Sequence, residues 1–389
     1  MKNLSYIDAF IPEGKEASQC SNCGICLQKC PVMKMGVEES KAEIARLING
    51  EDPKRVFDEC SFCFSCNHYC PQGLRPYNLI MERITAKYRD SGKDIPRELS
   101  YMMTGKNETG FVFDQYNAAP DEDKAILVRW SKVPPKAKDT LFIGCHGRTV
   151  PGSIEHSRVL SSLVKFGPRD ACCGELAYRF GDIETFVKTV ERTYRQLEAL
   201  ETDRLVCYCG SCSNFLGNVW PNYHKIKLPF KVISLYEWIW EKYQAGELSI
   251  QRQDPRKIVV SDSCYTSELG DGFYEALRGL YKASGMSLIE LENNRYDSLC
   301  CGMATALRES RGDRSEVAVT TKKKMEQIRA TKEKEVICNC PGCVGSLSHS
   351  LKLQGVKVSF GVNEILWAFG DDREYMKELK RDSPSGGVN

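Results

Sequence analysis

Twenty cysteines fall into regularly spaced groups, with none scattered between them. Eight lie near the N-terminus, and twelve form two further sets of six. In a secreted protein this count would indicate disulfides, whereas tight Cys-x-x-Cys groups in an intracellular chain indicate metal binding. Thiolates at such spacings hold either structural zinc or redox-active iron–sulfur clusters, so the first question is which of the two the spacing favours.

The first eight cysteines form two copies of one motif. CSNCGICLQKCP and CSFCFSCNHYCP both read Cys-x2-Cys-x2-Cys-x3-Cys-Pro. This is the spacing of bacterial two-cluster ferredoxins, in which the fourth cysteine binds the other cluster. It predicts two [4Fe–4S] clusters, with the ligands Cys20, Cys23, Cys26 and Cys70 for one and Cys60, Cys63, Cys66 and Cys30 for the other. Zinc needs only two Cys-x-x-Cys pairs, so the third cysteine of each run disfavours that alternative.

Helical periodicity surrounds these runs. Residues 38–49 place Ile44, Leu47 and Ile48 on one face, and residues 76–88 repeat the pattern. We therefore expect a helical ferredoxin-like domain over residues 1–100. Residues 101–136 are rich in helix-breaking residues and are expected to be a connector, in which 125–131 could be a strand or a short helix.

The other twelve cysteines belong to an internal repeat. In each copy an apolar run leads into a cysteine, a Cys-Cys-Gly follows, and a second apolar run enters Cys-x-Cys-x-x-Cys. We call each copy a CCG domain. Helices are expected between these motifs, over 153–166, 183–200, 272–284 and 315–330. Alternating strands and helices indicate parallel α/β units, which bind ligands in loops at the carboxyl ends of their strands.

The expected fold is therefore α+β and multidomain. A helical two-[4Fe–4S] ferredoxin domain precedes two repeated α/β CCG domains, over residues 137–250 and 251–375. Residues 376–389 are rich in Ser, Gly and Pro and are expected to be a disordered tail.

Each CCG copy offers five loop cysteines, one more than a cubane cluster needs. They are Cys145, Cys172, Cys173, Cys209 and Cys212 in the first copy, and Cys264, Cys300, Cys301, Cys340 and Cys343 in the second. Adjacent cysteines rarely close a strain-free disulfide, but each can bond a different iron. We expect one or two further [4Fe–4S] clusters of unusual geometry. The sixth cysteine of each copy, Cys207 or Cys338, lies in a strand and is interpreted as packing.

This combination of motifs resembles the heterodisulfide reductase family, in its D-type form that fuses a ferredoxin-like part to paired CCG domains, over most of residues 15–370. The resemblance implies that the five-cysteine sets hold non-cubane [4Fe–4S] clusters, which in that family cleave a disulfide. Similar proteins accompany class II benzoyl-CoA reductase and quinone-linked glycolate or lactate oxidoreductases. One loop departs from the family pattern, because 26 residues separate Cys145 from Cys172, against 35 between Cys264 and Cys300. The shorter loop weighs against disulfide chemistry at the first site.

Four functions fit these features. The favoured one is an electron-transfer subunit of an anaerobic oxidoreductase complex, which relays electrons from the ferredoxin-type clusters to the CCG clusters. The alternatives are a terminal heterodisulfide reductase, an iron–sulfur subunit of a glycolate or lactate oxidoreductase, and a ferredoxin domain followed by zinc-bound interaction modules. The sequence has no Gly-x-Gly-x-x-Gly after a strand and no haem motif, so a flavoprotein or other redox subunit is expected as partner.

Three basic groups near the cysteines are candidates for a role. His146 follows Cys145 and is a candidate catalytic proton donor to a leaving thiolate, with an ordinary loop histidine as the alternative. Arg148 could bind an anionic substrate, but a surface arginine is the simpler interpretation. Lys322–Lys324 are expected on the solvent face of a helix.

The composition excludes some classes of protein. The chain has 389 residues and a formal net charge of +2, so it lacks the basic excess of nucleic-acid-binding proteins. Neither a signal peptide nor an apolar stretch of about 20 residues is visible, so we expect a cytoplasmic protein that does not itself span a membrane. A membrane link would come through a partner such as a cytochrome.

Overall fold

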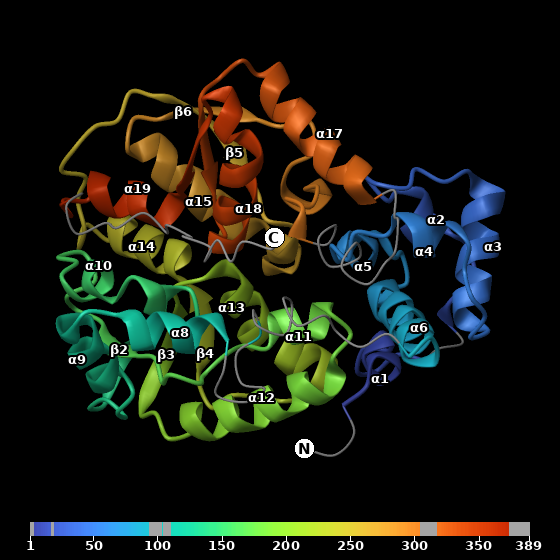
Figure 1. Ribbon diagram of the computed structural model, residues 1–389, viewed down its shortest axis with the longest axis horizontal. Helices are drawn as coiled ribbons and strands as arrows, with labels where there is room; N and C mark the ends of the chain where they lie inside the picture. Colours follow the sequence, from blue (N-terminus) through green and yellow to red (C-terminus); the bar gives the residue numbers. More distant parts are fainter. Residues whose placement is uncertain (1–3, 17–18, 93–102, 104–109, 304–316, 373–389) are drawn as a thin grey trace, which may run out of the picture.

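The computed structural model describes residues 4–16, 19–92, 103, 110–303 and 317–372. Figure 1 shows three parts: two α/β halves that face each other, and a helical N-terminal part beside both. The tail predicted over 376–389 and the first residues of the helix predicted over 315–330 lie outside the described residues.

In the described residues, the N-terminal part contains six helices. They are α1 (Tyr6–Phe10), α2 (Ile25–Gln28), α3 (Val37–Ile48), α4 (Arg55–Glu59), α5 (Ser65–Tyr69) and α6 (Pro76–Asp90). The two helices predicted around the cysteine runs are confirmed as α3 and α6. In α3, Glu38 and Glu39 lie in the first turn and Arg46 in the last, which complements the helix dipole. The buried face of α3 carries Ile44 and Leu47.

The described residues of the connector form two helices, α8 (Phe111–Ala118) and α9 (Asp121–Trp130). Residues 125–131, left open between strand and helix, are therefore mainly helical. Three acidic residues in the first turn of α9 favour the helix, because they face its positive end. Trp130 fixes α9 against the first half by donating from Nε1 to Glu155 at 2.9 Å.

Each half contains a four-stranded parallel sheet, and the two sheets have the same topology. The first consists of β1 (Ala137–Phe142), β2 (Val164–Phe166), β3 (Thr202–Cys207) and β4 (Lys231–Ser234), in the order β2-β1-β3-β4. The second consists of β5 (Lys257–Ser261), β6 (Ser287–Glu290), β7 (Glu335–Cys338) and β8 (Lys357–Phe360), in the order β6-β5-β7-β8. The predicted internal repeat is thus confirmed in three dimensions.

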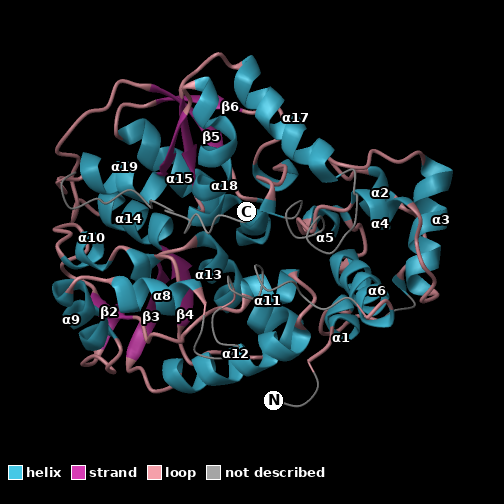
Figure 2. Ribbon diagram, in the orientation of Figure 1, coloured by secondary structure: helices cyan, strands magenta, loops and turns pink. Residues whose placement is uncertain are grey.

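Helices cover both sheets, as Figure 2 shows. They are α10 (Pro151–Glu155), α11 (Glu175–Arg179), α12 (Ile183–Leu197), α13 (Gly210–Asn214), α14 (Leu235–Gln244), α15 (Asp271–Ala283), α17 (Val317–Ala330), α18 (Pro341–Leu351) and α19 (Gly361–Ala368). The helices predicted over 183–200 and 272–284 are confirmed as α12 and α15. Helices α14 and α15 pack against each other and join the two halves.

The helix predicted over 153–166 is wrong beyond its first residues. Helix α10 ends at Glu155, and the chain later forms strand β2. The carboxylate of Asp371 accepts hydrogen bonds from the backbone N–H groups of Arg158 and Val159, at 2.8 and 3.2 Å. Those N–H groups would otherwise bond within the helix, so a contact from the C-terminal end of the described chain replaces the helix.

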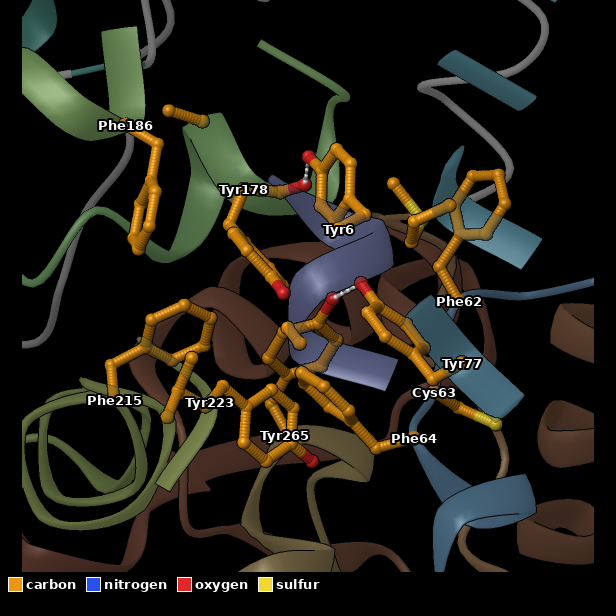
Figure 3. Packing of buried hydrophobic residues seen from close by; sticks show 14 of the residues in the cluster. Tyr6, Phe62, Cys63, Phe64, Tyr77, Tyr178, Phe186, Phe215, Tyr223 and Tyr265 are labelled. Atoms are coloured by element: carbon orange, nitrogen blue, oxygen red, sulfur yellow. Dashed lines mark hydrogen bonds between the residues drawn. The ribbon is translucent and has the colours of Figure 1, made fainter. Parts of the chain in front are cut away.

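An aromatic core joins the N-terminal part to both halves, and Figure 3 shows its central residues. The Tyr6 hydroxyl donates to the Tyr178 carbonyl, and the Tyr77 and Tyr265 hydroxyls are 2.7 Å apart. Tyr77 comes from α6, Tyr178 from the first half and Tyr265 from the second. The three parts of the molecule therefore share one hydrophobic core.

His224 lies buried at the edge of this core. Its ring is 5.4 Å from those of Tyr178 and Phe186, and it is 8% exposed. Its Nε2 has no hydrogen-bond partner among the described residues. Burial first, and the charge of Arg75 second, lower the pKa of His224 to about 4. An unfolded histidine titrates near 6.5, so only the unfolded chain gains this proton between pH 6.5 and 4, and stability falls as the pH falls.

We therefore expect His224 to lower the free energy of unfolding by about 2 kcal/mol when the pH falls from 7 to 5. His224→Phe should remove that part of the pH dependence, as measured by urea unfolding at both pH values. His349→Gln, which changes an exposed histidine on α18, is the control and should behave as wild type. A pH dependence that persists unchanged in His224→Phe would assign the loss to other groups.

Candidate metal centres

The two N-terminal runs adopt the same backbone conformation between their cysteines. Asn22 and Gly24 have φ values of +53° and +72°, and the equivalent Phe62 and Phe64 have +53° and +67°. Left-handed residues in such turns direct successive backbone N–H groups into an anion-binding concavity. A Cβ on Gly24 would lie 2.7 Å from backbone atoms of Ser40 and Lys41, so glycine is required there. Phe64 occupies the same place in the second run at a cost in backbone strain.

The eight thiols gather in two adjoining groups. Cys26 lies among Cys20, Cys23 and Cys70; burial raises its pKa, and the charges of these three raise it further. The pKa of Cys66 is likewise raised by burial and by its neighbours Cys60, Cys63, Cys26 and Cys30. The structure thus brings Cys70 to the first run and Cys30 to the second, and none of these cysteines is in a disulfide. Four converging thiols are a donor set that fits a [4Fe–4S] cluster.

The two groups differ in exposure. In the first group Cys20, Cys23 and Cys70 are half-buried and Cys26 is buried, whereas in the second group Cys30, Cys60 and Cys63 are buried and Cys66 is half-buried. The first group is therefore the more exposed of the two.

The ten loop cysteines of the CCG domains converge on one place. Nine of them line a single cavity of about 60 Å³ between the halves: Cys145, Cys172, Cys173, Cys209, Cys212, Cys264, Cys301, Cys340 and Cys343. The tenth, Cys300, contacts the thiols of Cys264 and Cys301. Cys209 of the first half contacts Cys340 of the second. The motifs did not indicate this meeting of the two sets.

The same local structure positions the cysteines in both halves. Cys145 and Cys264 follow the first strand of each sheet, β1 and β5. Cys209 and Cys340 precede α13 and α18, whose first turns carry Cys212 and Cys343. The amide of Gly174 donates to Cys172 Sγ, and that of Gly302 to Cys300 Sγ, each at 3.4 Å.

Backbone conformation and steric constraints favour glycine at the third position of each Cys-Cys-Gly. Gly174 and Gly302 have φ values of +84° and +115°, which favour glycine. A Cβ on Gly174 would also lie 2.7 Å from the Phe186 ring. The tripeptide therefore turns sharply after the second cysteine, so that both thiols stay at the cavity.

A buried ion pair crosses from the first half toward the second. Glu175 Oε1 lies 3.0 Å from Arg179 Nε, and Arg179 Nη2 lies 3.8 Å from Cys264 Sγ. The guanidinium also covers the Tyr265 ring at 3.4 Å. Burial raises the pKa of Glu175 to about 7, against the opposing charge of Arg179. Neither residue was predicted from the sequence, although an acid and a base four residues apart directly after Cys-Cys-Gly could have identified them.

Two further basic residues were interpreted wrongly as surface groups. Arg148 is 4% exposed and Lys324 is 1% exposed. Burial lowers the pKa of Arg148, while the pKa of Lys324 is raised because neighbouring thiolates, led by Cys343, outweigh its desolvation. Helix α17 turns Lys324 inward, where backbone carbonyls accept its hydrogen bonds. Of the three lysines in Lys322–Lys324, only Lys322 is exposed, and Lys323 is half-buried.

The remaining candidates are placed as follows. His146 lines the cavity and lies near Cys340 of the other half. Cys207 and Cys338 are the last residues of β3 and β7, are buried, and do not line the cavity. Burial raises the pKa of Cys338 to about 12.

The second ferredoxin group adjoins the second half. The charge of Cys63 contributes to raising the pKa of Cys264, so the two thiols are near each other. The Phe64 ring lies 4.7 Å from the ring of Tyr265. Helix α5 contributes further contacts: Ser65 Oγ donates to the Tyr296 carbonyl at 2.9 Å, and the His68 ring stacks on Tyr296 at 3.9 Å. Figure 1 shows α5 as the N-terminal helix that lies nearest the second half.

Comparison with known proteins identifies the parts. Residues 16–74 match the 4Fe-4S dicluster domain, and residues 140–217 and 258–348 match the cysteine-rich domain called CCG. The chain joins a 4Fe-4S dicluster domain to two CCG domains. The resemblance to the D-type chain of heterodisulfide reductase and to related iron–sulfur proteins is confirmed at modest identity.

Relatives that match most of this chain include the following three. One component of the fumarate reductase (CoM/CoB) of Methanothermobacter marburgensis is 24% identical over 92% of this chain and 73% of its own length. The D-type component of the dihydromethanophenazine:CoB--CoM heterodisulfide reductase of Methanosarcina barkeri is 23% identical over 89% of this chain and 91% of its own. The probable glycolate oxidase iron-sulfur subunit of Bacillus subtilis is 20% identical, over 88% and 90%.

Within the described ranges, no group of three or more His, Cys, Asp or Glu side chains is arranged to hold one metal ion. In the same part of the chain, no helix has both the length and the apolar character needed to cross a bilayer.

Proposed function

We propose that this chain is an electron-transfer subunit of an oxidoreductase complex, in which electrons pass from the ferredoxin-type groups to the CCG cavity. One observation supports this most directly: the thiol groups lie in series, because Cys26 of the first group lies near Cys66 of the second, and Cys63 of the second lies near Cys264 at the cavity. Iron–sulfur clusters bound to these groups would supply one-electron transfer. The related chains named above are, by their names, parts of oxidoreductases.

The residues of the chain would have distinct tasks in this role. The ferredoxin-type groups would be held by Cys20, Cys23, Cys26 and Cys70, and by Cys60, Cys63, Cys66 and Cys30. The half-exposed Cys20 side would meet a partner, a flavoprotein or another redox subunit, because the motifs indicate no flavin or nicotinamide site. Phe64 and Tyr265 would exclude water where the second group adjoins the second half.

Disulfide reduction is the second candidate, and the shared cavity favours it. The shorter loop between Cys145 and Cys172 removes no thiol from the cavity, since all five cysteines of the first set line it. The first site therefore keeps its full thiol set, and the expectation that the shorter loop disfavours disulfide chemistry stays a prediction. In this function the cavity would receive a disulfide, with His146 on its wall as the proposed proton donor.

Iron content and EPR of protein purified without oxygen would test both candidates. The relay predicts about sixteen irons, four for each of four clusters. A new signal on adding a thiol under oxidising conditions would favour disulfide chemistry, whereas sixteen irons without a response would favour relay alone. About eight irons together with zinc would contradict both and reduce the CCG halves to a scaffold.

A further inference from the structure

A buried cation ties the loops of the first set together. The Arg148 guanidinium donates from Nη1 to the Ile143 carbonyl at 3.0 Å and from Nη2 to the Ala171 carbonyl at 2.8 Å. Ile143 lies two residues before Cys145, and Ala171 lies one residue before Cys172. Arg148 thus joins the loop of the single cysteine to the loop of the cysteine pair.

A second cation makes the same connection in the other half. Lys324 Nζ donates to the carbonyls of Asp262 and Leu299, both at 2.9 Å, and to Ser298 Oγ at 3.3 Å. Asp262 lies two residues before Cys264, and Leu299 lies one residue before Cys300. The two carbonyls are therefore the equivalents of those that Arg148 binds.

The two cations come from different segments of the repeat. Arg148 lies in the short helix Gly147–Thr149 after β1, whereas Lys324 lies in α17. Two unrelated positions thus supply one positive charge to the same place in each half. Packing alone does not require this, because an apolar side chain fills a buried space at a lower desolvation cost.

The thiols supply the negative charge that these cations face. The charges that act to raise the pKa of Arg148 are those of Cys145, Cys172 and Cys212, followed by Asp170. Those that raise the pKa of Lys324 are the charges of Cys343, Cys301, Cys338 and Cys264. Among the described residues no ion pair with a carboxylate is found for either cation. A buried charge without a counter-charge costs several kcal/mol, so negative charge at the thiols stabilises both cations, and Asp170 adds a more distant charge at Arg148.

We propose that Arg148 and Lys324 are equivalent positioning residues, each of which holds the ligand loops of its own half together and raises the reduction potential of the group bound there. The inference rests on the proposed function, because it assumes clusters in the CCG cavity. A positive charge stabilises the reduced form of a cluster, and nearby charge and hydrogen bonding are among the factors that set cluster potentials.

Potentiometric EPR titration of the full chain, loaded with iron and sulfide without oxygen, tests this. In Lys324→Met, the oxidised-to-reduced ratio of one CCG signal should rise at least tenfold at the wild-type midpoint, which is a midpoint 59 mV lower for a one-electron couple. Lys324→Arg should restore the wild-type value. Arg148→Met should move the other CCG signal. The ferredoxin-type signals should not move in any variant, and Lys322→Met, an exposed change on the same helix, should behave as wild type.

The outcomes separate this inference from the proposed function. A wild-type chain with about eight irons overturns both. A wild-type chain with its full iron and an unchanged midpoint in Lys324→Met overturns the inference alone. If Lys324→Met loses its CCG signal, the midpoint is read from Lys324→Gln, where a fall supports the inference. An unchanged midpoint there, or loss of the signal from both neutral variants, overturns the effect of charge on potential.

Discussion

Cys301→Ala is expected to remove the iron of the second CCG set while leaving both ferredoxin-type clusters in place. Cys301 lines the cavity and its thiol contacts those of Cys300 and Cys343. Its loss therefore removes a central ligand of the second set. The iron content should fall from about sixteen to about twelve per chain. Iron analysis and EPR of the anaerobic protein measure this directly, and electron transfer to the cavity should fall with it.

Cys338→Ala is the matched control, because Cys338 is a buried cysteine of the same half that does not line the cavity. It should keep all its iron. A fall to about eight irons in Cys301→Ala would show that the two CCG sets, which touch through Cys209 and Cys340, assemble as one unit. Loss of all iron would contradict the division into ferredoxin and CCG sites.

Phe64→Ala is expected to loosen the N-terminal part from the two halves. The Phe64 ring is 1% exposed, stacks on Tyr77 at 4.0 Å and meets Tyr265 edge-on at 4.7 Å. Figure 3 shows the three rings side by side. Removing a buried phenylalanine ring costs about 3–5 kcal/mol. The denaturation midpoint of the loaded protein should fall accordingly, and the path from Cys63 to Cys264 should become open to water.

Phe64→Gly should be more stable than Phe64→Ala, which reverses the usual order of these residues. Both variants lose the ring, but glycine relieves the left-handed backbone, a strain of roughly 1 kcal/mol. Gly24 already occupies the equivalent place in the first run. If Phe64→Ala proves more stable than Phe64→Gly, backbone strain at φ +67° does not determine the order of stability.

Much of the fold was predictable because its signals are local. The apolar runs before Cys145 and Cys264 predicted strands, and both are central strands of parallel sheets. Strands β2 and β6 were missed because they are short and only partly buried, so they lack a continuous apolar run. The helix predicted after Ser153 fails because Asp371, more than 200 residues away, binds the backbone there.

The candidate site was predictable in its ligands but not in its surroundings. Cysteine spacing predicted which thiols are candidate cluster ligands, because such ligands come from short, closely spaced motifs. That the two sets face one cavity depends on how α14 and α15 join the halves, and no motif records it. The burial of Arg148 and Lys324 depends on carbonyls that only the folded chain brings together.

The uneven exposure of the first thiol group determines where oxygen attacks. Cys20, Cys23 and Cys70 are half-buried together, whereas most of the thiols behind them are buried and only single members such as Cys66 are half-buried. Oxidation of cysteine follows accessibility, so brief contact with air should damage the outer group first. An aged preparation would then keep the interior groups but lose the entry point for electrons, and would look inactive although most of its iron remained.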